Sequence, residues 1–263
     1  KDFKLILTIP FYTPKNKQRK EELFAVLRAN IKKKFIKKII LLIDDNTFKN
    51  KKLISSKLTI VRFNRRPTYA DWIKESRKNL NHDEYFVIAN ADIEFQDDFE
   101  ELTLKELKNE KSILLLSRYE LIGDKELRLV NNPYYCQDTW CLKSKDLENL
   151  DESHLSSMNI PLGFPRCDNK IAYEFWLRDW KLINPCLRIV TIHHQQSGIR
   201  NYDEKDKTII GNVAYVFPSE EIAKVSKVSL WLFTLTNRAP IAIRITKYLI
   251  NDNVKENGKV AMR

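Results

Sequence analysis

The chain has 263 residues, of which 43% are hydrophobic and 31% are charged, so it can bury the core of a large globular domain. It holds no apolar run near the roughly 20 residues that a membrane span requires, and no signal peptide is visible, so we expect a cytoplasmic protein. The net charge of +11 is not accompanied by a helix-turn-helix, RNP or zinc-finger pattern, and we therefore expect no nucleic-acid partner.

The first predicted elements are an apolar strand over residues 3–9 and a helix over residues 19–33. Much of the positive charge lies in and around this helix, between Lys15 and Lys38, and includes Arg19. Apolar residues at helical spacing give the helix one buried face, so we interpret the basic residues as its solvated outer face. A peripheral contact of that face with the inner surface of a membrane is an open alternative.

Further strands are predicted over residues 39–43 and 58–63, from Tyr85 onward, and over residues 112–117, with helices over residues 69–79 and 97–109 between them. Alternation at this spacing predicts right-handed βαβ units and a mostly parallel central sheet flanked by helices. In such a sheet, ligands bind just beyond the carboxyl ends of the strands. The strand from Tyr85 ends in Asn90 and Asp92, which could place a carboxylate on a hydrated metal ion or could simply close a turn and cap a helix.

These strand ends resemble the nucleotide-sugar-dependent glycosyltransferases of the GT-A fold, over roughly residues 3–203. Asn90-Ala91-Asp92 matches the Asp-x-Asp step of that family, and Asn90 departs from its first acid. The resemblance implies that Asp92 is a metal ligand, and a metal-independent variant stays open. It also implies a donor-binding set, namely Pro10, Tyr12, Asp44, Asp45, Arg66, Asn90, Ala91, Asp92 and Arg200.

Two segments of the second half add to the resemblance. Asp168 opens a predicted helix over residues 170–180, where it could cap the helix or, as the resemblance implies, serve as the general base. Asp138 is a second candidate for the base and, with Trp140, resembles the segment that lines the acceptor side. For Trp140, core packing is the slightly preferred interpretation.

A predicted strand over residues 187–192 ends in His193-His194. In the family, a late His completes the metal sphere and a neighbouring basic residue holds the diphosphate, so one of the two His is expected to bind metal and Arg200 to contact the diphosphate. Oxygen and imidazole ligands suit Mn²⁺ or Mg²⁺. A satisfied pair of core or turn histidines is the alternative.

The resemblance implies a metal-dependent, inverting transfer of a sugar from a nucleoside-diphosphate sugar, with UDP as the guessed nucleotide, to a glycan or lipid-linked acceptor, as in polysaccharide biosynthesis. A metal-dependent hydrolase or nucleotidyltransferase that uses Asp44, Asp45 and Asp92 stays open, as does a basic non-catalytic binding module.

We expect the glycosyltransferase domain to cover residues 1–217, with a nucleotide-sugar half up to about residue 117 and an acceptor half from about residue 118. Residues 218–263 are expected to form a C-terminal helical extension, with one or two helices over residues 225–250 that pack on the domain or on another module, and a frayed end. A monotopic membrane contact of these helices is the alternative. Since the chain starts at Lys1 without a methionine, we also expect it to be one module of a longer polypeptide.

Overall fold

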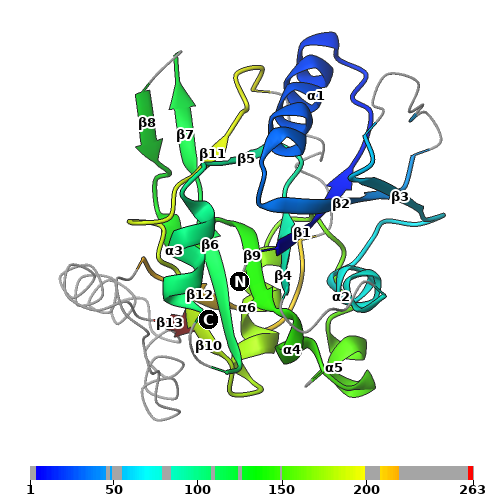
Figure 1. The fold of residues 1–263 in the computed structure, drawn as a ribbon. Coiled ribbons are helices and arrows are strands. Elements are labelled where there is room, and N and C mark those ends of the chain that lie inside the picture. The colour runs from blue at the N-terminus through cyan, green and yellow to red at the C-terminus, as the bar shows by residue number, and fades with distance from the viewer. Residues whose placement is uncertain are drawn as a thin grey trace.

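A computed structural model describes residues 4–45, 48, 55–78, 84–107, 110–123, 126–148, 150–198, 208–218 and 260–262. Their largest sheet has seven strands in the order β10-β6-β9-β4-β1-β2-β3 (Figure 1). The strands are β1 (Lys4–Phe11), β2 (Ile36–Ile43), β3 (Leu58–Arg62), β4 (Glu84–Ala89), β6 (Ser112–Ser117), β9 (Gln137–Lys143) and β10 (Lys181–Ile183). All neighbouring pairs are parallel except the two that involve β9. The predicted mostly parallel sheet is therefore confirmed.

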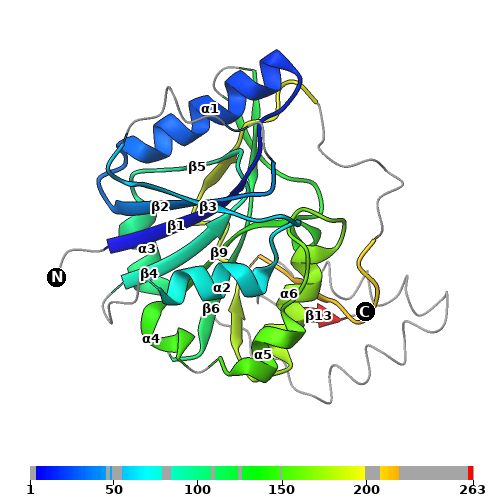
Figure 2. The same ribbon diagram turned by 90° about the vertical axis from the view of Figure 1, so that its right-hand side faces the viewer.

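Helices cover both faces of this sheet (Figure 2). One face carries α1 (Lys17–Lys32) and α3 (Phe99–Glu106), and the other carries α2 (Tyr69–Arg77), α4 (Ser144–Leu147), α5 (Glu152–Ser157) and α6 (Cys167–Trp176). Alternate residues of each strand point to opposite faces. In β1, Leu5 and Leu7 accordingly pack with Leu23 of α1, whereas Ile6 packs with Trp72 of α2.

A second sheet joins distant parts of the chain in the order β5-β11-β7-β8. Its strands are β5 (Ile93–Phe95), β7 (Tyr119–Ile122), β8 (Glu126–Leu129) and β11 (Thr191–His193). Strand β11 pairs antiparallel with β5, so that His193 lies opposite Ile93, and parallel with β7, so that His193 lies opposite Glu120. This pairing carries His193 to the residues that follow β4.

Several predicted boundaries differ from the structure. The strand predicted over residues 187–192 is only β11, because Arg188 and Ile189 donate backbone hydrogen bonds to the carbonyl of Pro185 and close a turn there. The helix predicted over residues 170–180 begins at Cys167 and ends at Trp176, and residues 181–183 then form β10. The hairpin of β7 and β8 was not predicted; Gly123, with a φ of 60°, lies just beyond β7.

The predicted C-terminal helices over residues 225–250 lie outside the described residues, so the extension stays a prediction. The frayed end is corrected in part, because β13 (Val260–Met262) pairs antiparallel with β12 (Ala214–Val216). No helix in the described part of the chain is both long and apolar enough to cross a membrane.

Candidate functional site

A cleft opens at the carboxyl ends of the parallel strands, where an open α/β sheet binds its ligands. Its walls come from the ends of β1, β2 and β4, the loop after β3, the start of β9 and the end of β11. The lining residues include Pro10, Tyr12, Arg19, Asp44, Arg66, Asn90, Ala91, Asp92, Arg118, Asp138, Gly163 and His193. The structure thus brings together most of the predicted donor-binding residues, which lie far apart in the sequence.

Arg19 is the buried cation of this cleft, with 4% of its surface exposed. It lies in the first turn of α1, which Asn16 caps by accepting a hydrogen bond from the Arg19 backbone N–H at 2.9 Å. Its guanidinium donates to Asp92, to Glu22 at 3.0 Å and to the carbonyl of His194 at 2.7 Å. The interpretation of Arg19 as part of a solvated outer face is therefore wrong.

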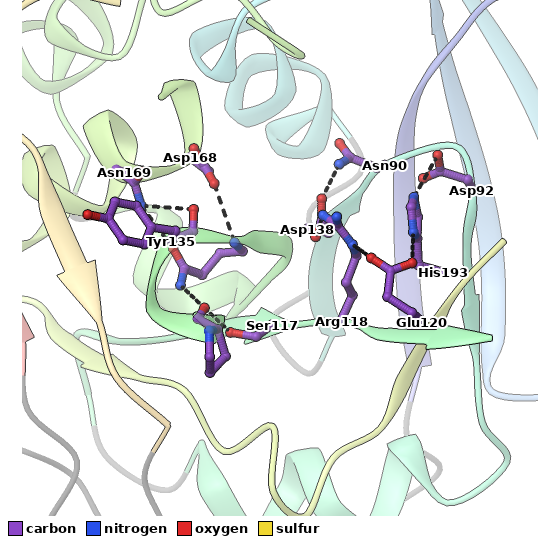
Figure 3. Close-up of polar contacts among 12 residues, drawn as sticks. Asn90, Asp92, Ser117, Arg118, Glu120, Tyr135, Asp138, Asp168, Asn169 and His193 are labelled. Atoms are coloured by element: carbon purple, nitrogen blue, oxygen red, sulfur yellow. Dashed lines mark hydrogen bonds and ion pairs between the residues drawn. The ribbon is translucent and has the colours of Figure 1, made fainter. Parts of the chain in front are cut away.

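His193 bridges two carboxylates (Figure 3). Its Nε2 lies 3.2 Å from Asp92 and its Nδ1 lies 2.7 Å from Glu120. Burial lowers the pKa of His193, but these carboxylates outweigh burial and raise the pKa to about 9, so the ring is cationic at neutral pH. Burial likewise opposes ionisation of Asp92, but His193 and Arg19 hold its pKa well below the usual range.

Asp138 is engaged on the other side of Asn90. It accepts hydrogen bonds from Asn90 Nδ2 and, at 2.7 Å, from Arg118 Nη1 (Figure 3). Arg118 also donates through Nε to Glu120 at 2.7 Å, so it links Asp138 to the His193 pair. Neither Arg118 nor Glu120 was predicted as a site residue.

The two acidic residues after β2 have different surroundings. Asp44 lines the cleft 3.4 Å from Arg66 Nη1, and Arg66 Nε donates to the carbonyl of Leu162 at 2.7 Å. Asp45 accepts backbone hydrogen bonds from Thr13 and Phe48, both at 2.8 Å, and is not a lining residue. Asp45 therefore ties two loops together behind the cleft.

Each carboxylate that lines the cleft is paired with an arginine: Asp44 with Arg66, Asp92 with Arg19, and Asp138 with Arg118. We refer to these as the three Arg–Asp pairs. The guanidinium groups of these pairs are charged hydrogen-bond donors and can bind an anion in the cleft.

The fit of these residues to a divalent ion can be tested directly. Asp92 Oδ1 is buried without a hydrogen-bond partner and could be a ligand, but Oδ2 accepts from Arg19 and lies beside His193. Both His193 nitrogens are engaged with carboxylates, whereas a metal-bound His must offer a lone pair. Among the residues that the structure describes, no group of three or more His, Cys, Asp or Glu could hold a metal ion. As arranged, the donor set does not fit a divalent ion.

His194 points away from the cleft. Its Nε2 lies 2.9 Å from Glu94, while its backbone N–H donates to the carbonyl of Asp92 at 2.9 Å. Of the two His predicted as metal ligands, only His193 is placed beside Asp92. Arg200 lies outside the described residues.

Asp168 lies in the first turn of α6 but is not its N-cap. The capping position belongs to Arg166, whose φ of 70° is left-handed and whose side chain makes no capping hydrogen bond. Asp168 Oδ2 is 3.4 Å from the backbone nitrogen of Gln137, which donates to it (Figure 3). Burial and the negative charge of Asp138 raise the pKa of Asp168 to about 7.

Trp140 is a core residue, with 2% of its surface exposed and its ring packed edge-on against Tyr69 at a centroid distance of 5.2 Å. It is therefore unavailable for stacking on a sugar ring. The acceptor contact predicted for Trp140 is therefore wrong, and the alternative interpretation as a core residue is correct.

No protein-family model matches the chain, and no curated protein matches its sequence. Solved structures do match. The crystal structure of GalNAc-T7 with UDP, GalNAc and Mn²⁺ aligns with a TM-score of 0.52 at 12% identity, over 76% of this chain and 46% of that one. The mannosyltransferase PcManGT from Pyrobaculum calidifontis, in complex with GDP-Man and Mn²⁺, aligns with a TM-score of 0.46 at 12% identity, over 72% and 56%.

A nucleotidyltransferase also aligns with the chain. It is 4-diphosphocytidyl-2C-methyl-D-erythritol synthase from Anaerococcus prevotii, with a TM-score of 0.45 at 20% identity, over 78% of this chain and 93% of that one. At these identities the comparisons show the fold alone. The chain has a GT-A-type fold, as the sequence predicted, and it spans about half the length of the two glycosyltransferase chains described above.

Proposed function

We propose that the chain is a glycosyltransferase that moves a sugar from a nucleoside-diphosphate sugar to an acceptor hydroxyl. The observation that carries this proposal is the cleft itself, in which three arginines line the carboxyl edge of a GT-A-type sheet. Arginine side chains bind phosphate oxygens through paired hydrogen bonds. The donor class follows from this chemistry, and UDP as its nucleotide stays a prediction.

The nucleoside end of the donor is proposed to lie against the ends of β1 and β2. Tyr12 is half-buried there and offers a ring face, and Asp44 offers a carboxylate for hydrogen bonds to a base or ribose. Asn90 and Ala91, between these residues and Asp138, would then face the ribose and the diphosphate. This order matches the roles that the resemblance implied for the same residues.

Asp168 is the proposed general base. With a pKa of about 7 it is half ionised at neutral pH, which suits a group that must accept a proton in each turnover. Asp138, by contrast, is held by Arg118 and Asn90 and is better suited to binding hydroxyl groups. Asp168 takes the proton of the acceptor hydroxyl while the acceptor oxygen forms a bond to the anomeric carbon. At the same time the bond between the anomeric carbon and the diphosphate breaks, and its electron pair stays on the diphosphate oxygen. Direct attack of this kind inverts the anomeric configuration.

The Mn²⁺ or Mg²⁺ that the resemblance implied has no step in this proposal, because the donor set does not fit a divalent ion. The glycan or lipid-linked acceptor and the peripheral membrane contact stay predictions.

An assay that distinguishes three reaction classes by their products tests the proposal. A panel of UDP-, GDP- and dTDP-sugars is incubated with the chain, with and without a mixture of glycoside and lipid-linked acceptors, and parallel reactions contain nucleoside triphosphates with sugar phosphates. A glycosyltransferase releases nucleoside diphosphate only when an acceptor is present. Equal release without any acceptor would indicate a hydrolase, and release of pyrophosphate from a nucleoside triphosphate would indicate a nucleotidyltransferase; either result overturns the proposal.

A further inference from the structure

We propose that the positive charge that neutralises the donor diphosphate in this cleft is the guanidinium of Arg19, held in place by Asp92, so that the reaction needs no divalent metal. This inference rests on the proposed glycosyltransferase function and names the group that binds the diphosphate. It assigns Asp92 to positioning Arg19 rather than to metal ligation.

The first support is the way in which Arg19 is fixed. Glu22 lies one helical turn further along α1, accepts from Arg19 at 3.0 Å, and also accepts from the backbone N–H of Ser197 at 2.8 Å. The carbonyl of His194 accepts from the same guanidinium at 2.7 Å. Two segments that are about 175 residues apart in the sequence thus hold one cation. Such convergence fixes the guanidinium in one geometry before any ligand binds.

The second support is that Arg19 faces the cleft. It is a lining residue together with Asp92, and the hydroxyl of Tyr12 interacts with its guanidinium. An arginine with only a structural role in α1 would have no need to reach both the proposed nucleoside contact and the Asn90–Asp92 turn. The position of Arg19 places a permanent positive charge between the proposed nucleoside contact and the Asn90–Asp92 turn.

The third support is the state of the carboxylates. Each lining carboxylate of the three Arg–Asp pairs already has a cation partner, so a divalent ion at Asp92 Oδ1 would compete with Arg19 and His193 at Oδ2 for the same negative charge. An arginine avoids this competition. It carries five N–H donors in a fixed plane, so it can keep its bond to Asp92 while other N–H groups bind phosphate oxygens.

The chemical role follows from the charge balance of the step. When the anomeric bond breaks, its electron pair stays on the diphosphate, and the leaving group gains a negative charge. Hydrogen bonds from a charged donor strengthen as that charge develops, so Arg19 lowers the barrier without exchanging a proton. The nucleoside diphosphate leaves with this added negative charge, and the hydrogen bond of Arg19 to Asp92 stays in place throughout.

Calorimetric titration of the chain with UDP, GDP and CDP tests the inference without any acceptor or turnover. Each titration is run once in EDTA and once in excess Mn²⁺. We expect at least one nucleoside diphosphate to bind in EDTA, with Mn²⁺ changing its Kd by less than about threefold. Binding that requires Mn²⁺ would overturn the inference and leave the proposed function standing.

Variants of α1 then show which cation is responsible. Arg19→Ala should weaken binding in EDTA by about 10- to 100-fold, and Arg19→Lys, which keeps the charge but loses the planar fork, by less. Arg28→Ala is the matched control, because Arg28 is exposed on the same helix, and it should bind like wild type. If Arg19→Lys and Arg19→Ala both bind nucleoside diphosphate with wild-type affinity, the inference is overturned. Since Arg19→Ala removes a buried partner, thermal melts accompany each titration, and Arg19→Lys is decisive if Arg19→Ala does not fold.

Asp92→Asn gives an effect of opposite sign under the two interpretations. If Asp92 only positions Arg19, the side-chain oxygen of the asparagine still accepts a hydrogen bond from the guanidinium, and affinity in EDTA is kept or increases because a competing negative charge is gone. If Asp92 is a metal ligand, the same variant loses an Mn²⁺-dependent affinity. Failure of all three nucleoside diphosphates to bind under either condition would overturn the proposed function and this inference with it.

Discussion

The paired aspartates of the cleft and Asp168 at the start of α6 show how one residue type acquires two roles. In the three Arg–Asp pairs a guanidinium group lies within hydrogen-bond distance of each carboxylate, and Arg19 and His193 hold the pKa of Asp92 well below its usual range. Around Asp168, burial and the like charge of Asp138 outweigh the backbone N–H donors and raise the pKa to about 7. A carboxylate that is paired with an arginine orients its neighbours, whereas a carboxyl group that ionises near neutral pH can move a proton.

The largest expected effect comes from removing the proton acceptor. Asp168→Asn keeps the size and one acceptor oxygen of the side chain but cannot take a proton, so turnover should fall about 100-fold or more. Affinity for nucleoside diphosphate and the melting temperature should stay near wild type. Steady-state kinetics with matched calorimetry measure both. Turnover near the wild-type rate would break the comparison and make Asp138→Asn the next variant to measure.

A smaller effect, on stability, is expected from opening one Arg–Asp pair. Arg118→Ala leaves the carboxylates of Asp138 and Glu120 without their shared partner, which should cost about 2 kcal/mol of unfolding free energy. Arg128→Ala in β8 is the control, because the Arg128–Glu126 pair is exposed and should contribute less than about 0.5 kcal/mol. Urea unfolding measures the free energy of unfolding of both variants. Equal losses would show that the pairing of Arg118 with Asp138 stabilises the fold no more than an exposed ion pair does.

Gly163 offers a test of the Arg66–Asp44 pair without changing a charge. Gly163 and Gly123 both have positive φ, 76° and 60°, so an alanine at either position should cost about 1 kcal/mol in backbone strain. A Cβ on Gly163 would in addition lie 2.6 Å from Arg66 Nη2, whereas a Cβ on Gly123 meets nothing within 4 Å. Both variants should therefore lose similar stability, but only Gly163→Ala should lose nucleotide affinity. Unchanged binding by Gly163→Ala would argue against a donor contact from Arg66.

The last expected effect is a pH dependence of stability that belongs to Asp168. Its pKa is raised in the folded state to about 7 from a usual value of 3.8, so the folded chain binds the extra proton between these values. The stability contributed by that proton is complete below about pH 4 and is lost as pH rises toward 7. Relative to wild type, Asp168→Asn should therefore become more stable as pH rises through this window. Melting temperatures are measured for both proteins across this pH range. A difference in melting temperature that stays the same at every pH would contradict the raised pKa.

The sequence predicted the sheet and its polar edge because both depend on local patterns. Apolar runs that end in Asp44 or in Asn90-Ala91-Asp92 mark buried strands and their carboxyl ends, wherever the rest of the chain lies. The role of His193 could not be separated from that of His194 in the same way. That difference depends on β11, which pairs with two strands from the first half of the chain.

Arg19 is instructive because a signal for it was present. It precedes Leu23 by four residues and Val26 by seven, so it falls on the buried stripe of the helix and not on its basic outer face. A cation on an apolar stripe needs a buried partner, and this points to a site. Arg118 and Glu120 carried no such signal, since the small sheet that presents them forms only when β11 arrives.

The dependence of the site on β11 also sets the order in which the molecule can become functional during synthesis. Strands β1 to β4 leave the ribosome early, yet β4 lacks its neighbour β9 until about 50 further residues have been made, and β5 lacks its neighbour β11 until about 100 have been made. Contacts that close so long a loop form late and slowly. Until residue 193 is available, Asp92 and Arg19 lack His193 and the carbonyl of His194, so a nascent or truncated chain that ends near residue 117 would be unable to hold the donor.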